Sequence, residues 1–267
     1  MKDFKEYHLG FEAKIVSPEV PGEKSRALLS LQEEVESSVI SYPKSMPMAI
    51  KRAKGAIVED VDGNRYIDFF AGCGVLNVGH CNQDVLSSVF KQQKDLIHAL
   101  DFPTENKMRL INNILSELPA EYRNDYKVGF TSPSGSDAVE AAIKLAKHYT
   151  GRSGVLAFQG SYHGMGSGSL AVTSDLSHKS GISSLMPEVN FVPYSYCYRC
   201  SFGKNGENCQ FECVNYLENL LENPHSGLPK PAAILLEPVQ CEGGNIVPKK
   251  GYLKRIIELA KKHAVVT

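Results

Sequence analysis

The 267-residue sequence lacks an excess of charge of either sign. Lysine and arginine together number 29 against 30 aspartates and glutamates, which gives a formal net charge of −1. Nucleic-acid binding normally requires a strongly basic face, so this balance argues against it as the main function. Hydrophobic residues make up 42% of the chain. That share supplies a core and excludes disorder for most of the sequence.

Long apolar runs are also missing. No stretch approaches the roughly 18–20 residues that a membrane-spanning helix requires. The first 19 residues, MKDFKEYHLGFEAKIVSPE, have neither the apolar centre nor the small-residue cleavage site of a secretory signal. We therefore expect a cytoplasmic protein.

Two nucleotide-binding fingerprints are absent as well. The sequence contains no P-loop, and no predicted strand is followed by GxGxxG. A nicotinamide-dependent oxidoreductase is accordingly the weakest of the functions that we consider.

The first part of the chain mixes helices with a hairpin. After an arm to about residue 23, Leu28, Leu31, Val35 and Val39 recur at helical spacing and predict a helix over 25–40. A proline-rich crossing over 41–50 precedes two strands, 56–61 and 65–70, joined by the turn Asp62-Gly63-Asn64. A glycine-rich loop then covers 71–80. Two further helices are predicted over 83–98 and 105–118.

From residue 127 onward strands alternate with helices. The predicted strands are 127–131, 154–158, 189–193 and 232–237, with 264–266 beginning another apolar segment. The predicted helices are 136–149, 211–222 and 251–263. This alternation is typical of an α/β fold with a mainly parallel sheet, in which ligands bind at the carboxyl ends of the strands. Three such strand ends carry candidate site residues.

The first candidate is the turn Ser134-Gly135-Ser136, which leads from a strand directly into a helix. A helix N-terminus offers free N–H groups and a positive dipole, Gly135 permits close approach, and the serines add hydroxyls. These features predict a phosphate-binding site. The alternative is an ordinary capped helix, in which the cap stabilises the helix by about 1 kcal/mol.

The second candidate is the loop at 158–169, FQGSYHGMGSGS. An aromatic ring on a glycine-rich loop can stack on a planar ligand, which makes Tyr162 a candidate for that contact. His163 is a candidate acid or base. The alternative is a flexible loop that carries an ordinary packed tyrosine.

The third candidate is Glu237, at the end of the apolar strand predicted over 232–237 and before Pro238. A carboxylate at this edge of the sheet is a plausible site residue. The alternative is a strand-ending glutamate that pairs with a nearby arginine or lysine.

Four of the seven cysteines are clustered in the sequence, at Cys197, Cys200, Cys209 and Cys213. Four thiolates can hold Zn²⁺ in a tetrahedral site, and the polar segment between them suits a small zinc knuckle. In a reducing compartment the alternative is four free thiols in a surface insertion, here residues 194–215. The spacing leaves both possibilities open.

Four blocks of sequence together resemble the class III, or ornithine/4-aminobutyrate-type, pyridoxal-phosphate-dependent aminotransferases. They are AKGAIVEDVDGNRYIDFFAGCGVLNVGH, SGSDAVEAAIKLAK, GSYHGMG and EPVQCEGG, which occur in family order. Three shorter segments, SYPKSMPMAIKRAKG, HALDFPT and PYSYCYRCSFG, are similar to the members that act on ω-amino groups of diamino acids, such as diaminobutyrate aminotransferases.

The resemblance implies an aspartate-aminotransferase-like fold, PLP fold type I, and a homodimer. It places the cofactor phosphate at Gly135 and Ser136, with Ser134 bordering it. Tyr162 would stack on the pyridine ring, His163 would support that face, and Glu237 would face the substrate side. The implied reaction moves an ω-amino group from a diaminobutyrate- or 4-aminobutyrate-like donor to a 2-oxo acid such as 2-oxoglutarate.

The resemblance also divides the chain. It implies an N-terminal arm and small-domain segment over 1–70 and a cofactor-binding large domain over 71–267. The family's Schiff-base lysine and the aspartate that pairs with the pyridine nitrogen would lie beyond Thr267. The 267-residue chain by itself is therefore expected to be inactive. The alternatives are an inert remnant, a zinc-binding module, or a related aminomutase or decarboxylase.

Overall fold

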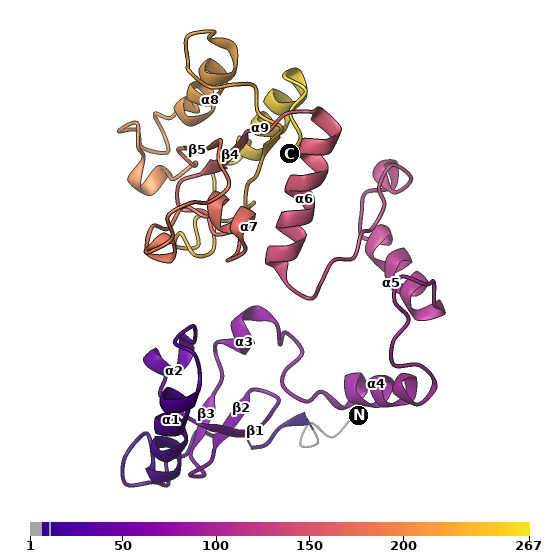
Figure 1. Cartoon of the computed structure of the whole chain (residues 1–267), viewed down its shortest axis with the longest axis vertical. Helices are drawn as coiled ribbons and strands as arrows, with labels where there is room; N and C mark the ends of the chain where they lie inside the picture. Colours follow the sequence, from indigo (N-terminus) through magenta and orange to yellow (C-terminus); the bar gives the residue numbers. More distant parts are fainter. Residues whose placement is uncertain (1–6, 11) are drawn as a thin grey trace. The chain divides into compact units, whose positions relative to one another are not determined.

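The computed structural model describes residues 7–10 and 12–267. The chain forms two compact units, residues 1–113 and 114–267, and each is described by itself (Figure 1). The domain boundary expected from the resemblance, after residue 70, stays a prediction.

The first unit is built on a three-stranded antiparallel sheet. Its strands are β1 (Ile50–Lys54), β2 (Ile57–Asp60) and β3 (Arg65–Ile67), in the order β1-β2-β3. The predicted hairpin is confirmed, because Val58 of β2 pairs with Tyr66 of β3 across the Asp62-Gly63-Asn64 turn. The prediction of an extended crossing over 41–50 was wrong in part, because the helix α2 (Tyr42–Ser45) lies within this segment and β1 begins at its last residue.

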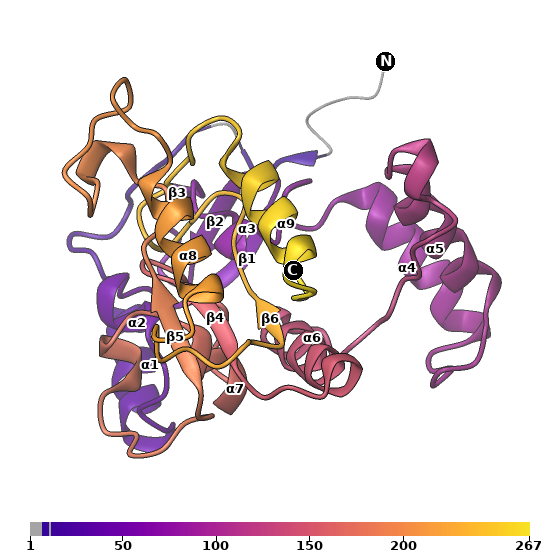
Figure 2. The same ribbon diagram turned by 90° about the horizontal axis from the view of Figure 1, so that it is seen from above.

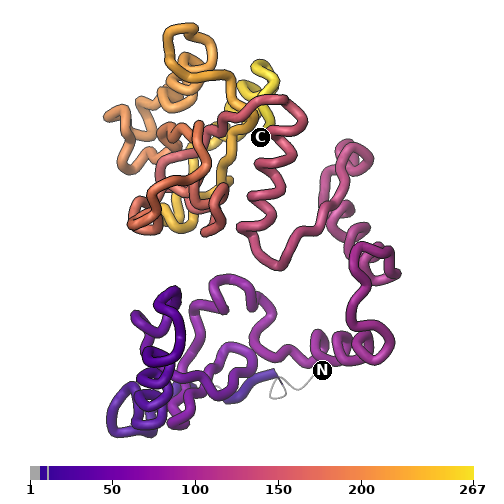
Figure 3. Tube along the Cα trace, in the orientation of Figure 1, coloured from indigo at the N-terminus to yellow at the C-terminus, as the bar shows by residue number. Residues whose placement is uncertain are grey.

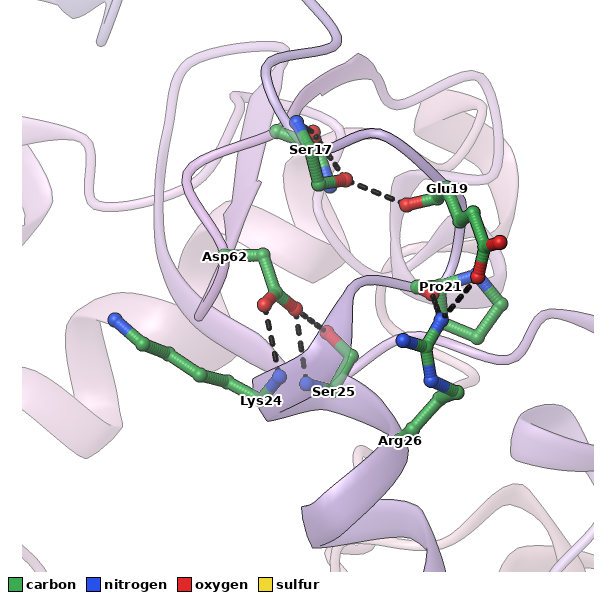
Figure 4. Close-up of polar contacts among 8 residues, drawn as sticks. Ser17, Glu19, Pro21, Lys24, Ser25, Arg26 and Asp62 are labelled. Atoms are coloured by element: carbon green, nitrogen blue, oxygen red, sulfur yellow. Dashed lines mark hydrogen bonds and ion pairs between the residues drawn. The ribbon is translucent and has the colours of Figure 1, made fainter.

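The hairpin turn also caps the first helix, α1 (Glu23–Val35). Asp62 accepts hydrogen bonds from the backbone N–H groups of Lys24 and Ser25, each at 2.9 Å, and from the Ser25 hydroxyl at 2.6 Å (Figure 4). Gly22, which precedes the helix, has no side chain to provide a cap. The carboxylate thus satisfies N–H groups that a helix start leaves free.

The helix predicted over 25–40 is shorter than expected. It ends at Val35, and Val39 lies beyond it with 88% of its surface exposed. Ser37 and Ser38 follow, and serine side chains compete with helical backbone hydrogen bonds, which favours an end here. The other helices of this unit are α2 (Tyr42–Ser45), α3 (Ala71–Gly74), α4 (Gln83–Asp95) and α5 (Glu105–Ser116).

The second unit contains a parallel sheet of three strands, β4 (Val155–Phe158), β5 (Val189–Val192) and β6 (Ala233–Ile234), in the order β5-β4-β6. Val266 forms an isolated parallel bridge with Ala233 of β6, so the apolar segment at 264–266 lies beside that strand. The predicted parallel α/β architecture is confirmed.

Helices cover both faces of this sheet, as Figure 2 shows. They are α6 (Gly135–Thr150), α7 (Ser167–Val172), α8 (Glu212–Glu222) and α9 (Tyr252–Lys262). Alternate residues of β4 enter different cores: Leu156 and Phe158 pack with α8 and α9, while Val155 and Ala157 pack with α6 and α7. A strand buried on both faces explains the continuous apolar run of β4.

Two predictions for this unit were wrong in detail, and one helix was missed. Residues 127–131 form no strand, because no neighbouring strand in the described structure pairs with them. The chain here leads as an irregular segment into α6 (Figure 3). The strand predicted over 232–237 is only two residues long. The short α7 was not predicted.

Single turns of 3-10 helix lie at Ala120–Tyr122, Ser177–Lys179 and Cys197–Arg199. Within the described residues, no helix has the length and apolar character that crossing a membrane would demand.

Candidate active site

The N-terminus of α6 lies where the sequence predicts a phosphate site. Ser134 is the N-cap residue, and its hydroxyl accepts a hydrogen bond from the backbone N–H of Ser136 at 3.2 Å. Ser134, Gly135 and Ser136 all line one cavity of about 490 Å³. The cap that we gave as the alternative is therefore real, and it leaves the start of α6 facing a cavity.

The Ser136 hydroxyl joins α6 to the glycine-rich loop. It lies 2.6 Å from the Ser169 hydroxyl and accepts the backbone N–H of Gly166 at 3.1 Å. A Cβ added to Gly164, whose φ is +122°, would lie 2.7 Å from the Cβ of Ser136. This close approach explains why the loop needs glycine opposite the start of α6.

Tyr162 lies between two cavities. It lines the 490 Å³ cavity with the α6 N-terminus and also a second cavity of about 250 Å³. Its ring meets that of His178 edge to face, with 5.6 Å between centroids. The tyrosine is only partly buried, so its ring remains available to a ligand.

His163 borders the first cavity and is nearly buried, with 9% of its surface exposed. Its backbone N–H donates to the Thr173 hydroxyl at 2.9 Å, but its buried Nε2 has no hydrogen-bond partner among the described residues. Burial lowers the pKa of this imidazole, against the opposing effect of the nearby Glu237 charge. A neutral imidazole with an unsatisfied ring nitrogen is the result.

Glu237 holds two strand-end loops together. Its Oε1 accepts the backbone N–H of Tyr162 and its Oε2 accepts that of Cys241, both at 3.0 Å. The alternative of an arginine or lysine partner is wrong, because backbone amides occupy both oxygens. Burial, with a smaller effect of the Glu237 charge, raises the pKa of the neighbouring Tyr194 to about 12.

The structure brings five of the six predicted site residues to one cavity. Those that line it are Ser134, Gly135, Ser136, Tyr162 and His163. Glu237 does not line this cavity, and it contacts the lining residues only through its hydrogen bond with the backbone N–H of Tyr162. A cavity with helix N–H groups at one side and an aromatic ring at another can accept a planar ligand that carries a phosphate.

Sequence reasoning missed several residues that support this cavity. Glu140 accepts the backbone N–H groups of Gly168 and Ser169, at 2.8 and 2.7 Å. Glu140 lies four residues after Ser136 and so shares its helix face, which is the one signal that could have identified it. The second cavity, beside Tyr162, adds Asp175, His178 and Glu242.

The described structure does not gather the clustered cysteines around a common point. Within the described residues, no three or more His, Cys, Asp or Glu side chains are placed to hold an ion. Cys209 and Cys213 are buried thiols, whereas Cys197 and Cys200 are partly exposed. Burial, with contributions from the nearby Cys209 and Cys200, raises the pKa of Cys213 to about 11. The zinc hypothesis therefore has no support from these side-chain positions.

Comparison with known proteins identifies the family and the fold. The family described as aminotransferase class-III matches residues 40–267 of this sequence. The chain belongs to the class III aminotransferases. Members of this family depend on pyridoxal phosphate, and their solved structures have PLP fold type I. The expectations for family, fold class and cofactor are confirmed.

The curated relatives that match this chain include diaminobutyrate–2-oxoglutarate aminotransferases. A diaminobutyrate–2-oxoglutarate aminotransferase of Haemophilus influenzae is 43% identical over 240 residues, covering 89% of this chain and 52% of that protein. The diaminobutyrate–2-oxoglutarate aminotransferase of Rhizobium meliloti is 43% identical over 233 residues, covering 85% of this chain and 49% of that protein. The chain thus spans about half the length of the curated relatives it matches.

Solved transaminase structures show the same fold. An (S)-enantioselective omega-transaminase from Thermomicrobium roseum aligns with a TM-score of 0.77 at 24% identity, covering 95% of this chain and 57% of that one. A transaminase from the marine bacterium Virgibacillus aligns with a TM-score of 0.75 at 25% identity, covering 90% of this chain and 54% of that one.

Proposed function

We propose that this chain supplies the cofactor-phosphate and ring-stacking contacts of an aminotransferase. The reaction would move the ω-amino group of a diaminobutyrate-like donor to a 2-oxo acid such as 2-oxoglutarate. The observation that carries the proposal is one cavity lined by the start of α6, by Tyr162 and by His163.

The residues present fit pyridoxal phosphate. The first turn of α6 would bind the phosphate through backbone N–H groups and the Ser136 hydroxyl, since a helix N-terminus favours an anion. Tyr162 would stack on the ring, which contributes roughly 0.5–1.5 kcal/mol beyond burial of its surface. The unpartnered Nε2 of His163 is a buried polar atom beside this cavity, where a ligand could satisfy it.

When bound, pyridoxal phosphate supplies a reactive aldehyde and an electron-withdrawing ring, which is the chemistry that amino-group transfer needs. The work of this chain is to bind and orient that group. Glu237 would contribute by fixing the backbone at Tyr162, and His163 would contribute as a neutral imidazole. The family's substrate-side role for Glu237 stays part of the proposal.

Similarity to diaminobutyrate–2-oxoglutarate aminotransferases supports the donor and acceptor. By the same resemblance we propose a cytoplasmic homodimer. Purified protein from cells that express the complete gene is the material for a test. It should form glutamate from 2-oxoglutarate with 2,4-diaminobutyrate at a higher kcat/KM than with 4-aminobutyrate or ornithine.

The same assay separates the alternative activities. Migration of the amino group within the substrate, without any need for 2-oxoglutarate, would indicate an aminomutase. Release of CO₂ would indicate a decarboxylase. Either result would replace the transaminase assignment. Preference for 4-aminobutyrate over 2,4-diaminobutyrate would keep the reaction but overturn the donor.

A further inference from the structure

Two glutamates hold the segment that carries Tyr162. We call residues 159–166, between β4 and α7, the tyrosine loop. Glu237 contacts the loop near its start, and Glu140 contacts the chain just after its end. Neither glutamate lines the cavity that the loop helps to form. Their action on any ligand there would therefore be indirect.

At the end of the loop, Glu140 caps the short helix α7. The N-cap residue Gly166 has no side chain, and Oε1 of Glu140 accepts the N–H groups of the second and third residues of α7, Gly168 and Ser169. A Cβ on Gly168 would lie 2.4 Å from the Glu140 carboxylate. Because Glu140 belongs to α6, this contact ties the end of the loop to the helix that carries Ser136.

Near the start of the loop, Glu237 holds the backbone of Tyr162 itself. The backbone of Glu237 is fixed in turn, because its carbonyl accepts the Tyr194 hydroxyl at 3.0 Å. Tyr194 is buried in the core, where its ring packs edge to face with Phe158 and Tyr252. The position of Tyr162 is therefore linked to the rigid interior of the unit.

We infer that Glu140 and Glu237 are positioning residues that clamp the tyrosine loop from both sides and so hold Tyr162 at the cavity lined by the α6 N-terminus. The carboxylates are suited to this task because each accepts two backbone N–H groups, and charge-assisted hydrogen bonds are stronger than neutral ones. The consequence for cofactor binding rests on the proposed function, whereas the clamp itself does not.

Amide hydrogen exchange at single residues tests the clamp without any ligand. In Glu237→Ala, exchange at Tyr162 and Cys241 should become about tenfold faster or more, as expected for loss of a hydrogen bond to a charged acceptor. In Glu140→Ala, amide exchange should instead become faster at Gly168 and Ser169. The matched control, Glu258→Gln on the exposed face of α9, should alter none of these amides. Unchanged exchange at both amides of either alanine variant would overturn the clamp.

Ligand binding then separates positioning from a general loss of structure. Glu237→Ala should raise the Kd of pyridoxal phosphate about tenfold but leave the Kd of inorganic phosphate within about twofold, because the α6 N-terminus is intact. Equal weakening of both ligands would overturn the positioning role. Glu237→Gln, which keeps one acceptor oxygen, should fall between wild type and alanine, and it replaces the alanine variant if that one unfolds.

Failure of the clamp and failure of the proposed function give different results. If the wild-type chain bound neither ligand, the proposed cofactor site would be wrong, and the exchange pattern alone would decide the clamp. If pyridoxal phosphate bound normally in Glu237→Ala while exchange rose, the cofactor site would stand and the positioning role would be overturned.

Discussion

The Glu237 carboxylate accepts the backbone N–H of Tyr162 at 3.0 Å, although the two residues are 75 positions apart in the chain. This contact joins the ends of β4 and β6, which are neighbours in the parallel sheet. Parallel strands deliver their carboxyl ends to the same edge, so the pairing follows from the topology. The glutamate that we expected to face the substrate side therefore also accepts hydrogen bonds from the loop backbone.

The ring of Tyr162 is the first target for substitution. Tyr162→Ala should raise the Kd of pyridoxal phosphate up to about tenfold, since stacking contributes roughly 0.5–1.5 kcal/mol beyond surface burial. Tyr162→Phe keeps the aromatic face and should bind within about twofold of wild type. Fluorescence or absorbance titration of the cofactor measures both. Equal effects of the two substitutions would count against stacking.

Gly135 allows a test that spares the fold. A Cβ added at this position meets no atom within 4 Å, yet Gly135 lines the cavity. Gly135→Ala should therefore keep the wild-type Tm while raising the Kd of pyridoxal phosphate about tenfold or more, because the methyl group would occupy the site of close phosphate approach. Gly206→Ala, which also adds a Cβ in open space but outside the cavity, is the control.

His163 gives a pH prediction for the second unit. Its pKa is lowered by burial from an unfolded value near 6.5, so the folded state favours the neutral imidazole. The resulting contribution to stability is fully present above pH 6.5 and is lost as the pH falls toward the folded pKa. His163→Gln should flatten the dependence of the unfolding free energy on pH below about 6.5. An unchanged slope in denaturant titrations would contradict this.

Glu59 gives an acid-stability prediction for the first unit. Hydrogen bonds from Arg52, at 2.8 and 2.9 Å, and from Arg65, at 3.0 Å, hold the pKa of Glu59 at about 2 against an ordinary 4.5. The stabilising effect is therefore present above pH 4.5 and lost as the pH falls through about 2.

Glu59→Gln should remove this acid transition and lower stability at neutral pH. Circular dichroism during acid titration measures both effects. Glu121→Gln, an exposed glutamate in the other unit, provides the control. The prediction fails if the variant and wild type lose stability over the same acid range.

The resemblance to the family predicts that no lysine of the 267-residue chain forms the Schiff base. Borohydride reduction in the presence of pyridoxal phosphate should therefore attach the cofactor to no single lysine. Peptide mapping by mass spectrometry measures the distribution. One lysine labelled reproducibly at one equivalent per chain would contradict the account.

Local sequence patterns were sufficient for some elements. The amphipathic run of α6, its Ser134 cap and the turn at Asp62-Gly63-Asn64 depend on neighbouring residues, and all three were found. The buried strand β4 could be found because four consecutive apolar residues suit a strand covered on both faces. The meeting of the tyrosine loop and Glu237 follows from the parallel pairing of β4 and β6, whereas the strand predicted before α6 is absent.

Tertiary contacts decided what the sequence could not show. Residues 127–131 have an apolar pattern but no strand partner in the described structure, and a strand requires one. The Glu140 contact with α7 depends on a helix that carries no recognisable pattern of its own. The choice of Glu237 between a cationic partner and backbone amides likewise depends on the path of a distant loop.

The central claim is that the start of α6 and Tyr162 form a pyridoxal-phosphate site, and calorimetric titration of the chain with pyridoxal phosphate tests it most directly. The account predicts saturable binding at one site per chain, weaker binding of pyridoxal, which lacks the phosphate, and loss of affinity in Gly135→Ala with an unchanged Tm. Equal affinity for pyridoxal and pyridoxal phosphate, or wild-type affinity in Gly135→Ala, would contradict it.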